Sequence, residues 1–140
     1  MILLTPDLRF ALRANAINRQ ACEGQGTPFD PPPLVKLFNP LSAATWLASE
    51  LGDDGDTLFG LADLGFGCPE LGTFSLSEIA ALRLPYGMAI ERDVAFETRF
   101  PLSRWAATAR EAGSIIWAEQ LLRRAAAEEF PPSIEDKGRG

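Results

Sequence analysis

Apolar residues recur at helical spacing near both ends of the chain. The N-terminal stripe consists of Leu8, Ala11, Leu12 and Ala16. It follows Thr5-Pro6-Asp7, which combines an N-cap residue, a proline suited to the first helical position and an acid in the first turn. This pattern predicts a helix that begins after Thr5 and ends at about Arg19.

A second helical region is expected from residue 103 to about residue 129. Its apolar stripe consists of Ile115, Ala118, Leu122 and Ala125. Ser103 is the expected N-cap. Gly113-Ser114 offers a break in the middle, so the region forms either one helix or two.

Short apolar runs lie between these two regions, separated by segments rich in Gly, Pro and Asp. They predict strands at 34–38, 45–51, 57–64, from 73 onward and at 90–97. In the second strand, alternation places Trp46, Ala48 and Glu50 on one face, and Leu47, Ser49 and Leu51 on the other. Gly60 marks a bulge or a close backbone approach in the third. Because the connections are short, we expect an antiparallel meander.

The stretch ELGTFSLSEIAAL, residues 70–82, predicts a helix start in detail. Ser75 and Glu78 fit a capping box, in which the serine accepts from the Glu78 backbone N–H and Glu78 reaches back to the serine. Phe74 and Ile79 fit the hydrophobic staple around it. A short helix to about Arg83 should follow. The capping and staple roles explain the notable residues of this stretch without any catalytic role. Glu70, which precedes the helix, is the exception.

Together these elements predict the α+β fold class. We expect a small antiparallel sheet of four to five strands packed with an N-terminal helix, a short middle helix and C-terminal helices. With 140 residues, the chain fits a single domain over about 1–130, followed by a flexible polar tail at 131–140.

The amino-acid composition restricts the kinds of catalytic and metal site that the chain can form. The chain has no histidine, which removes Ser-His-Asp and Cys-His catalysis and most zinc sites. Cys22 and Cys68 stand in no metal-ligand spacing and are expected to be free thiols. No apolar run is long enough for a membrane helix, and the N-terminus lacks the basic region of a secretory signal, so we expect a cytoplasmic location.

Acidic residues dominate the middle of a chain whose net charge is −6. No Lys or Arg lies between Lys36 and Arg83, whereas that interval holds Glu50, Asp53, Asp54, Asp56, Asp63, Glu70 and Glu78. Such a field repels phosphates, which argues against direct nucleic-acid binding. Two interpretations stay open: acids on hairpin turns that confer solubility, or an acidic surface that docks onto a basic partner.

Four segments carry a resemblance to a known family: VKLFNP at 35–40, ATWLASE at 44–50, TLFGLADLG at 57–65 and ELGTFSLSEI at 70–79, extended by IERDVAFE at 90–97. In this order they resemble a bacterial family classed only as a domain of unknown function, number twenty-nine fifty-eight. Family members usually carry Trp-Tyr where this chain has Trp46-Leu47, and Tyr where Thr73 stands. The resemblance covers roughly residues 1–105, so the helix after Trp105 looks like an addition to the family core. It implies frequent occurrence on plasmids and other mobile elements, and no agreed activity.

Three groups of residues are candidates for a functional site. Asp63, Glu70, Glu91 and Asp93 would form a Mg²⁺ site if they converged, although turn and strand-end carboxylates are usually solvated. Arg92, between Glu91 and Asp93, either pairs with acids on a neighbouring strand or helps this short strand present an edge to a partner. Trp117 lies off the apolar stripe of the last helix, and its exposure would indicate a docking surface or a dimer seam.

From these observations we expect a non-enzymatic accessory protein of a mobile genetic element that binds another protein through an acidic surface. A defence-modulating or DNA-mimic role would fit. We expect no catalytic residue, no metal and no cofactor. The expected binding residues are Glu50, Asp53, Asp54, Asp56, Glu70, Glu91, Arg92, Asp93 and Trp117. The alternatives are a carboxylate-dependent, divalent-metal hydrolase or nuclease and, for assembly, a homodimer through the C-terminal helix.

Overall fold

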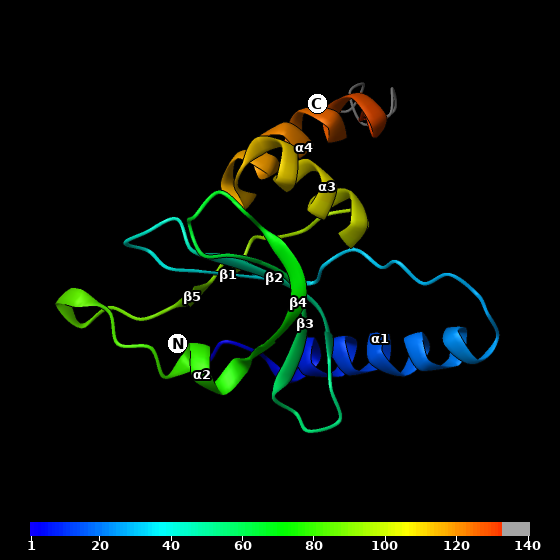
Figure 1. Cartoon of the computed structure of the whole chain (residues 1–140), viewed down its shortest axis with the longest axis horizontal. Helices are drawn as coiled ribbons and strands as arrows, with labels where there is room; N and C mark the ends of the chain where they lie inside the picture. The colour runs from blue at the N-terminus through cyan, green and yellow to red at the C-terminus, as the bar shows by residue number, and fades with distance from the viewer. Residues whose placement is uncertain (133–140) are drawn as a thin grey trace.

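An antiparallel sheet separates two pairs of helices in the computed structural model, which describes residues 1–132 (Figure 1). Its five strands are β1 (Val35–Phe38), β2 (Thr45–Leu51), β3 (Thr57–Asp63), β4 (Glu70–Ser75) and β5 (Glu91–Arg92), in the order β4-β3-β2-β1-β5. The first four strands form the predicted meander, and β5 returns to pair with β1. The predicted α+β class is confirmed.

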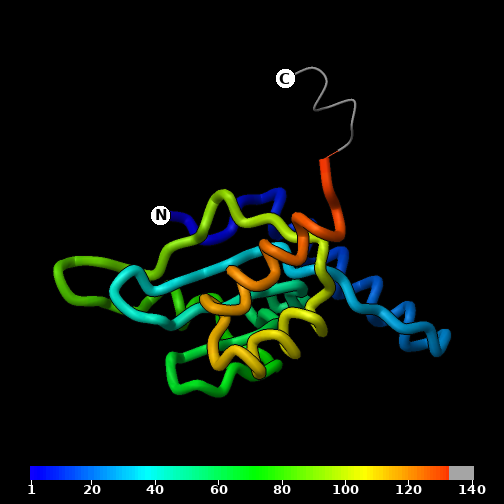
Figure 2. The backbone as a smooth tube through the Cα atoms, turned by 90° about the horizontal axis from the view of Figure 1, so that it is seen from above, coloured from blue at the N-terminus to red at the C-terminus, as the bar shows by residue number. Residues whose placement is uncertain are grey.

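Each face of the sheet carries its own hydrophobic core. The first core lies between the sheet and helices α1 (Pro6–Gly24) and α2 (Leu76–Ala80). The second lies between the opposite face and helices α3 (Leu102–Ala112) and α4 (Ile115–Glu129), which pack side by side (Figure 2). Its largest members include Leu47, Leu61, Phe100, Trp105 and Leu122. The 3-10 turn η1 (Pro85–Gly87) lies outside both cores.

Helix α1 begins as the sequence predicts and ends later. Thr5 Oγ1 accepts a hydrogen bond from the Leu8 backbone N–H at 3.2 Å. The helix continues past the expected end at Arg19, because residues 20–24 contain nothing that breaks a helix before the terminal glycine. It ends where the Thr27 backbone N–H bonds to the Cys22 carbonyl oxygen.

A bulge in β2 overturns part of the predicted face assignment. Ala48 pairs with Gly60 and Glu50 with Phe59, so Ser49 is an extra residue opposite β3. Beyond it, Leu51 returns to the face of Ala48 in the first core, and Glu50 turns to the opposite face. The prediction for Gly60 is confirmed, because a Cβ at this position would lie 1.7 Å from the Leu47 carbonyl oxygen.

The predicted boundaries of the last two strands were wrong. Strand β4 begins at Glu70, which pairs with Ala62, so Glu70 lies in a strand and not in a preceding loop. Strand β5 stops after Arg92 because the Asp93 carboxylate accepts a hydrogen bond from the Ala95 backbone N–H and turns the chain there. The expected strand at 90–97 therefore shrinks to two residues.

Helix α2 has half of the predicted capping box. Ser75 Oγ accepts from the Glu78 backbone N–H at 3.2 Å, but within residues 1–132 Glu78 makes no reciprocal bond. Asp56 serves this helix start instead, since its carboxylate accepts from the Ser77 backbone N–H at 2.8 Å. The helix ends at Ala80, before the expected Arg83.

The C-terminal region forms two helices. Gly113 ends α3 with a φ of 84°, a conformation that glycine adopts without strain, and Ser114 caps α4. Ser103 is not the N-cap of α3, which follows Pro101. Its hydroxyl and backbone N–H bind the carboxylate of Asp30 instead, so an acid distant in sequence serves this helix start.

Every helix in the described range is too short or too polar to cross a membrane. Residues 131 and 132 follow α4 without regular structure, and the rest of the predicted flexible tail lies outside the described residues.

Candidate functional site

The turn between β2 and β3 (residues 52–56, the acidic hairpin) contains a local hydrogen-bond network. Asp54 accepts bonds from the Thr57 hydroxyl at 2.6 Å and from the backbone N–H groups of Thr57 and Asp56 at 2.8 and 2.9 Å. Asp56 accepts from the Ser75 hydroxyl at 2.6 Å. These two acids thus shape the turn and cap α2, and Asp53 is exposed beside them.

The same hydrogen bonds favour the ionised forms of Asp54 and Asp56. The Thr57 hydroxyl and then its backbone N–H lower the pKa of Asp54 to about 2. The Ser75 hydroxyl and then the Ser77 backbone N–H lower the pKa of Asp56. Asp54 is exposed and Asp56 is half-buried, and both carboxylates contribute negative charge to this end of the sheet at neutral pH.

Helix α1 brings three arginines to the same end of the sheet. Arg9 and Arg13 donate to the carbonyl oxygens of Gly55 and Leu51, at 3.1 and 2.8 Å. Arg19 Nε binds Glu50 Oε2 at 2.5 Å, and the Glu50 side chain is buried. Glu50 therefore joins α1 to β2 and is not part of an exposed acidic patch.

The four carboxylates of the metal hypothesis lie on different parts of the sheet. Glu70 starts the edge strand β4, whereas Glu91 lies on β5 at the opposite edge. Asp63 is fully buried, and its two oxygens accept from the backbone N–H groups of Gly65 and Ile115. Within residues 1–132, no group of three or more His, Cys, Asp or Glu side chains is placed to hold a metal ion.

Arg92 and Asp93 tie the β5 edge to other parts of the fold. Arg92 Nη1 donates to the carbonyl oxygens of Ile2 and Leu3, at 3.1 and 2.8 Å, and not to acids on a neighbouring strand as one alternative proposed. Asp93 lies 3.5 Å from Lys36 Nζ, which also binds Glu119 on α4 at 2.8 Å. These contacts hold β5, β1 and α4 together.

Exposed apolar side chains gather at the end of the sheet opposite the acidic hairpin. We call this surface the apolar end; its members are Leu41, Leu64, Phe66, Ile116 and Trp117, all of them exposed. The loops at 39–44 and 64–69 meet there, since a Cβ on Gly65 would touch the Ala43 side chain at 3.8 Å. The bond from Ile115 to Asp63 holds the start of α4 against the second loop.

The segments that form the apolar end contain no charged residue. This holds for residues 39–44, 64–69 and 114–118. Phe66 is 82% exposed and Trp117 is 51% exposed. Sequence reasoning singled out Trp117 and missed Phe66, although the absence of charge in both loops was visible. The apolar end also carries Cys68, a free and exposed thiol, whereas Cys22 is half-buried.

Tyr86 is a further exposed residue that sequence reasoning did not place. It is 93% exposed at the tip of the loop closed by the hydrogen bond from the Leu84 backbone N–H to Met88. Its φ of 62° is unusual for a residue other than glycine. The Pro-Tyr-Gly sequence is the local feature from which this turn could have been predicted.

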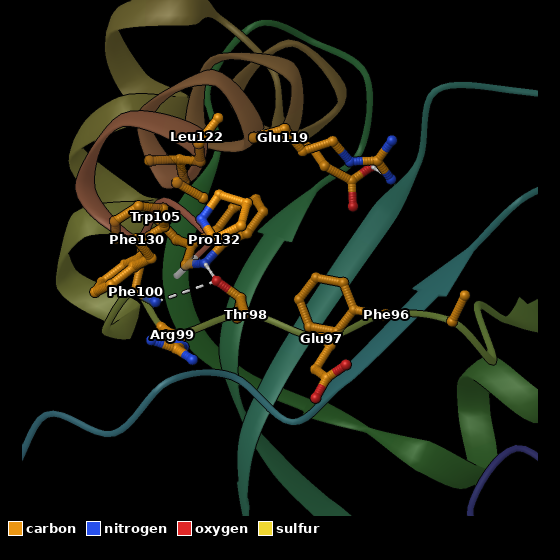
Figure 3. A pocket seen from close by; sticks show the side chains of 14 residues that line it. Phe96, Glu97, Thr98, Arg99, Phe100, Trp105, Glu119, Leu122, Phe130 and Pro132 are labelled. Carbon is orange, nitrogen blue, oxygen red and sulfur yellow. Dashed lines mark hydrogen bonds and ion pairs between the residues drawn. The ribbon is translucent and has the colours of Figure 1, made fainter. Parts of the chain in front are cut away.

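A groove of about 770 Å³ lies on the side of the sheet that α3 and α4 cover (Figure 3). One wall is the irregular segment 95–100, and the other is the second half of α4. Aromatic side chains line it, among them Phe96, Phe100, Trp105 and Phe130. It lies apart from the apolar end and from the acidic hairpin.

Residues 3–116 match the model of the family described as "Protein of unknown function (DUF2958)". The chain belongs to this family. The predicted resemblance is confirmed, and the DUF2958 match continues through α3, beyond the expected limit at residue 105. No curated protein and no solved structure matches the chain.

The DUF2958 match includes the acidic hairpin and almost all of the apolar end. It stops at Ile116, before the part of α4 that lines the groove.

Proposed function

We propose that this DUF2958 protein acts by binding another protein, and that the apolar end is its main contact surface. The main observation that supports this proposal is the grouping of five exposed apolar residues at one end of the sheet: Leu41, Leu64, Phe66, Ile116 and Trp117. The cores of protein interfaces are enriched in aromatic residues and depleted of charge. The three segments of the apolar end carry Phe66 and Trp117 and no charged residue, and charged side chains such as Glu70 and Arg110 lie at their border. Exposed apolar side chains grouped at one end of a folded chain are typical of an interaction site.

The acidic hairpin is a second surface in this proposal. It lies at the opposite end of the sheet, and hydrogen bonds lower the pKa values of Asp54 and Asp56. A basic partner would meet fixed negative charge there, although Arg9 and Arg13 reduce the local field. The sequence resemblance supports a role in a mobile genetic element, with a defence-modulating or DNA-mimic function as part of the proposal.

This proposal is preferred to the carboxylate-dependent hydrolase or nuclease. Such an enzyme would need carboxylates gathered around one ion. Here Asp63 is committed to two backbone N–H groups, and β3, β2 and β1 lie between the strands of Glu70 and Glu91.

Site-specific photocrosslinking in the native host tests the proposal. A benzophenone side chain would replace Phe66 in one protein and Phe10 in a matched control. The two residues are 82% and 78% exposed, but Phe10 lies on α1. We expect one discrete protein adduct from position 66, none from position 10, and loss of the adduct when Trp117→Ala is added.

Equal adducts from both positions, or none from position 66, would contradict the proposal. An adduct at twice the mass of the chain would instead identify the apolar end as the seam of a homodimer.

A further inference from the structure

The groove between segment 95–100 and α4 combines an apolar floor with a free hydroxyl donor. Thr98 Oγ1 accepts from the Trp105 indole Nε1–H and from the Phe100 backbone N–H, both at 3.2 Å (Figure 3). A hydroxyl has one proton to donate. Trp105 and Phe100 occupy its acceptor sites, and no oxygen atom within residues 1–132 accepts its proton, so that proton is available to an acceptor in the groove.

The charged side chains around the groove differ in whether they have a partner of opposite charge. Glu119 binds Lys36 at 2.8 Å and lies 3.8 Å from Arg123, and Lys36 also lies 3.5 Å from Asp93, so both cations have a carboxylate nearby. Arg99 forms no ion pair within residues 1–132, and its guanidinium lies 4.8 Å from the centre of the Phe130 ring. In Figure 3 the Glu97 carboxylate points away from α4. Arg99 and Arg123 both line the groove, and of these two Arg99 is the one without a carboxylate partner within residues 1–132.

We propose that this groove binds a small aromatic carboxylate. The carboxylate accepts from the Arg99 guanidinium and the Thr98 hydroxyl, and the aromatic body lies against Phe96, Trp105 and Leu122. A volume of about 770 Å³ suits a molecule of this size. The inference is independent of the protein-binding role of the apolar end, which uses other residues.

The Trp105 indole N–H is a direct reporter, since it donates to the hydroxyl that meets the ligand. The chain has three tryptophans. Trp46 belongs to the first core, and Trp117 lies at the apolar end, so both serve as internal controls. The probe is 2-naphthoate, titrated into ¹⁵N-labelled full-length protein and followed by NMR.

We expect a saturable shift of the Trp105 indole signal with a Kd on the order of 1 mM or tighter, and small shifts of the other two. Arg99→Gln should weaken binding by about tenfold, because a charge-assisted hydrogen bond is lost. Arg124→Gln is the matched control and should bind as the parent does, since Arg124 is exposed on α4 and does not line the groove. Ala127→Trp, which fills the groove from an exposed position, should abolish the shift.

Three results would overturn the proposal. The first is no saturable Trp105 shift at about 10 mM naphthoate, which corresponds to negligible affinity. The second is an unchanged affinity of Arg99→Gln for naphthoate, or an equal affinity of the parent protein for the neutral analogue 2-naphthalenemethanol. Either result would mean that naphthoate binds only through non-specific apolar contacts. The third is a Trp105 shift caused by protein concentration alone, which would place a second copy of the chain in the groove.

Discussion

The buried carboxylate of Asp63 on β3 accepts a hydrogen bond from the backbone N–H of Ile115, the first residue of α4, at 2.9 Å. Its other oxygen accepts from the Gly65 backbone N–H at 2.8 Å. One side chain thus fixes both the loop and the helix start that form the apolar end. Because free N–H groups at a helix N-terminus favour an acceptor with negative charge, this contact also orients α4 on the sheet.

Replacement of Asp63 should destabilise the fold strongly. Asp63→Ala leaves the buried Ile115 backbone N–H without its acceptor, at a cost of about 1–3 kcal/mol, and also removes the bond to the more exposed Gly65 N–H. We expect a loss of about 3 kcal/mol in the free energy of unfolding, measured by urea denaturation. Asp53→Ala, on the exposed turn, is the control and should change the value by less than about 0.5 kcal/mol. Similar losses in the two variants would contradict the role of Asp63.

Two glycines that face each other across β3 and β4 should respond differently to the same substitution. Gly60 pairs with Gly72 in the sheet. A Cβ at position 60 would lie 1.7 Å from the Leu47 carbonyl oxygen, whereas at position 72 it would meet nothing within 4 Å. Gly60→Ala should cost at least about 3 kcal/mol or prevent folding, and Gly72→Ala should cost less than about 1 kcal/mol. Circular dichroism during thermal unfolding distinguishes the two outcomes.

Stability should fall as pH falls from about 5 to about 2. The pKa of Asp54 is about 2 in the folded chain, below its ordinary value of 3.8, and that of Asp56 is also lowered. A lowered folded-state pKa stabilises the fold above the unfolded pKa, and this contribution disappears as the carboxylate is protonated. Asp54→Asn, which cannot ionise, should show a smaller decrease in urea midpoint between pH 5 and pH 2. An identical decrease would show that the turn hydrogen bonds do not favour the ionised form.

Loss of Arg19 should cost more than loss of an exposed arginine. The Glu50 side chain is 8% exposed, so Arg19→Ala leaves a mostly buried carboxylate without its partner. We expect a loss of about 2 kcal/mol in unfolding free energy, against less than about 0.5 kcal/mol for Arg124→Ala. Adding Glu50→Gln to Arg19→Ala should restore part of the loss, because a neutral amide is less costly to bury. The Arg19 guanidinium also lies 5.5 and 5.4 Å from the centres of the Phe29 and Phe59 rings. No recovery would indicate that these ring contacts are the main contribution of Arg19.

The local parts of this fold could be predicted because their causes are close in sequence. Thr5 and Ser75 cap helices whose first amides lie three residues away. The caps formed by Asp63 and Asp30 could not be predicted, because the acceptor and the helix start lie 52 and 73 residues apart. Only the folded sheet brings them together.

The surfaces were predicted less well than the elements, for a related reason. A count of acids suggested one acidic face, but folding buries Glu50 against Arg19 and commits Asp63 to α4. The bulge at Ser49 could not be placed from the alternation within β2, because it depends on how β2 pairs with β3 beside Gly60. The apolar end arises where two hairpin loops meet a helix, a relationship that periodicity along one element does not reveal.

The division into two cores also bears on the order in which the chain folds during synthesis. Every buried residue of the first core lies between positions 3 and 90. The second core needs Phe100, Trp105, Ile115 and Leu122 as well. Domains emerge from the ribosome N-terminus first. The sheet can therefore assemble on α1 and α2 before α3 and α4 are synthesised. Until then its other face, with Leu47 and Leu61, stays exposed to solvent. A nascent chain paused before α4 would therefore be the form most in need of a chaperone.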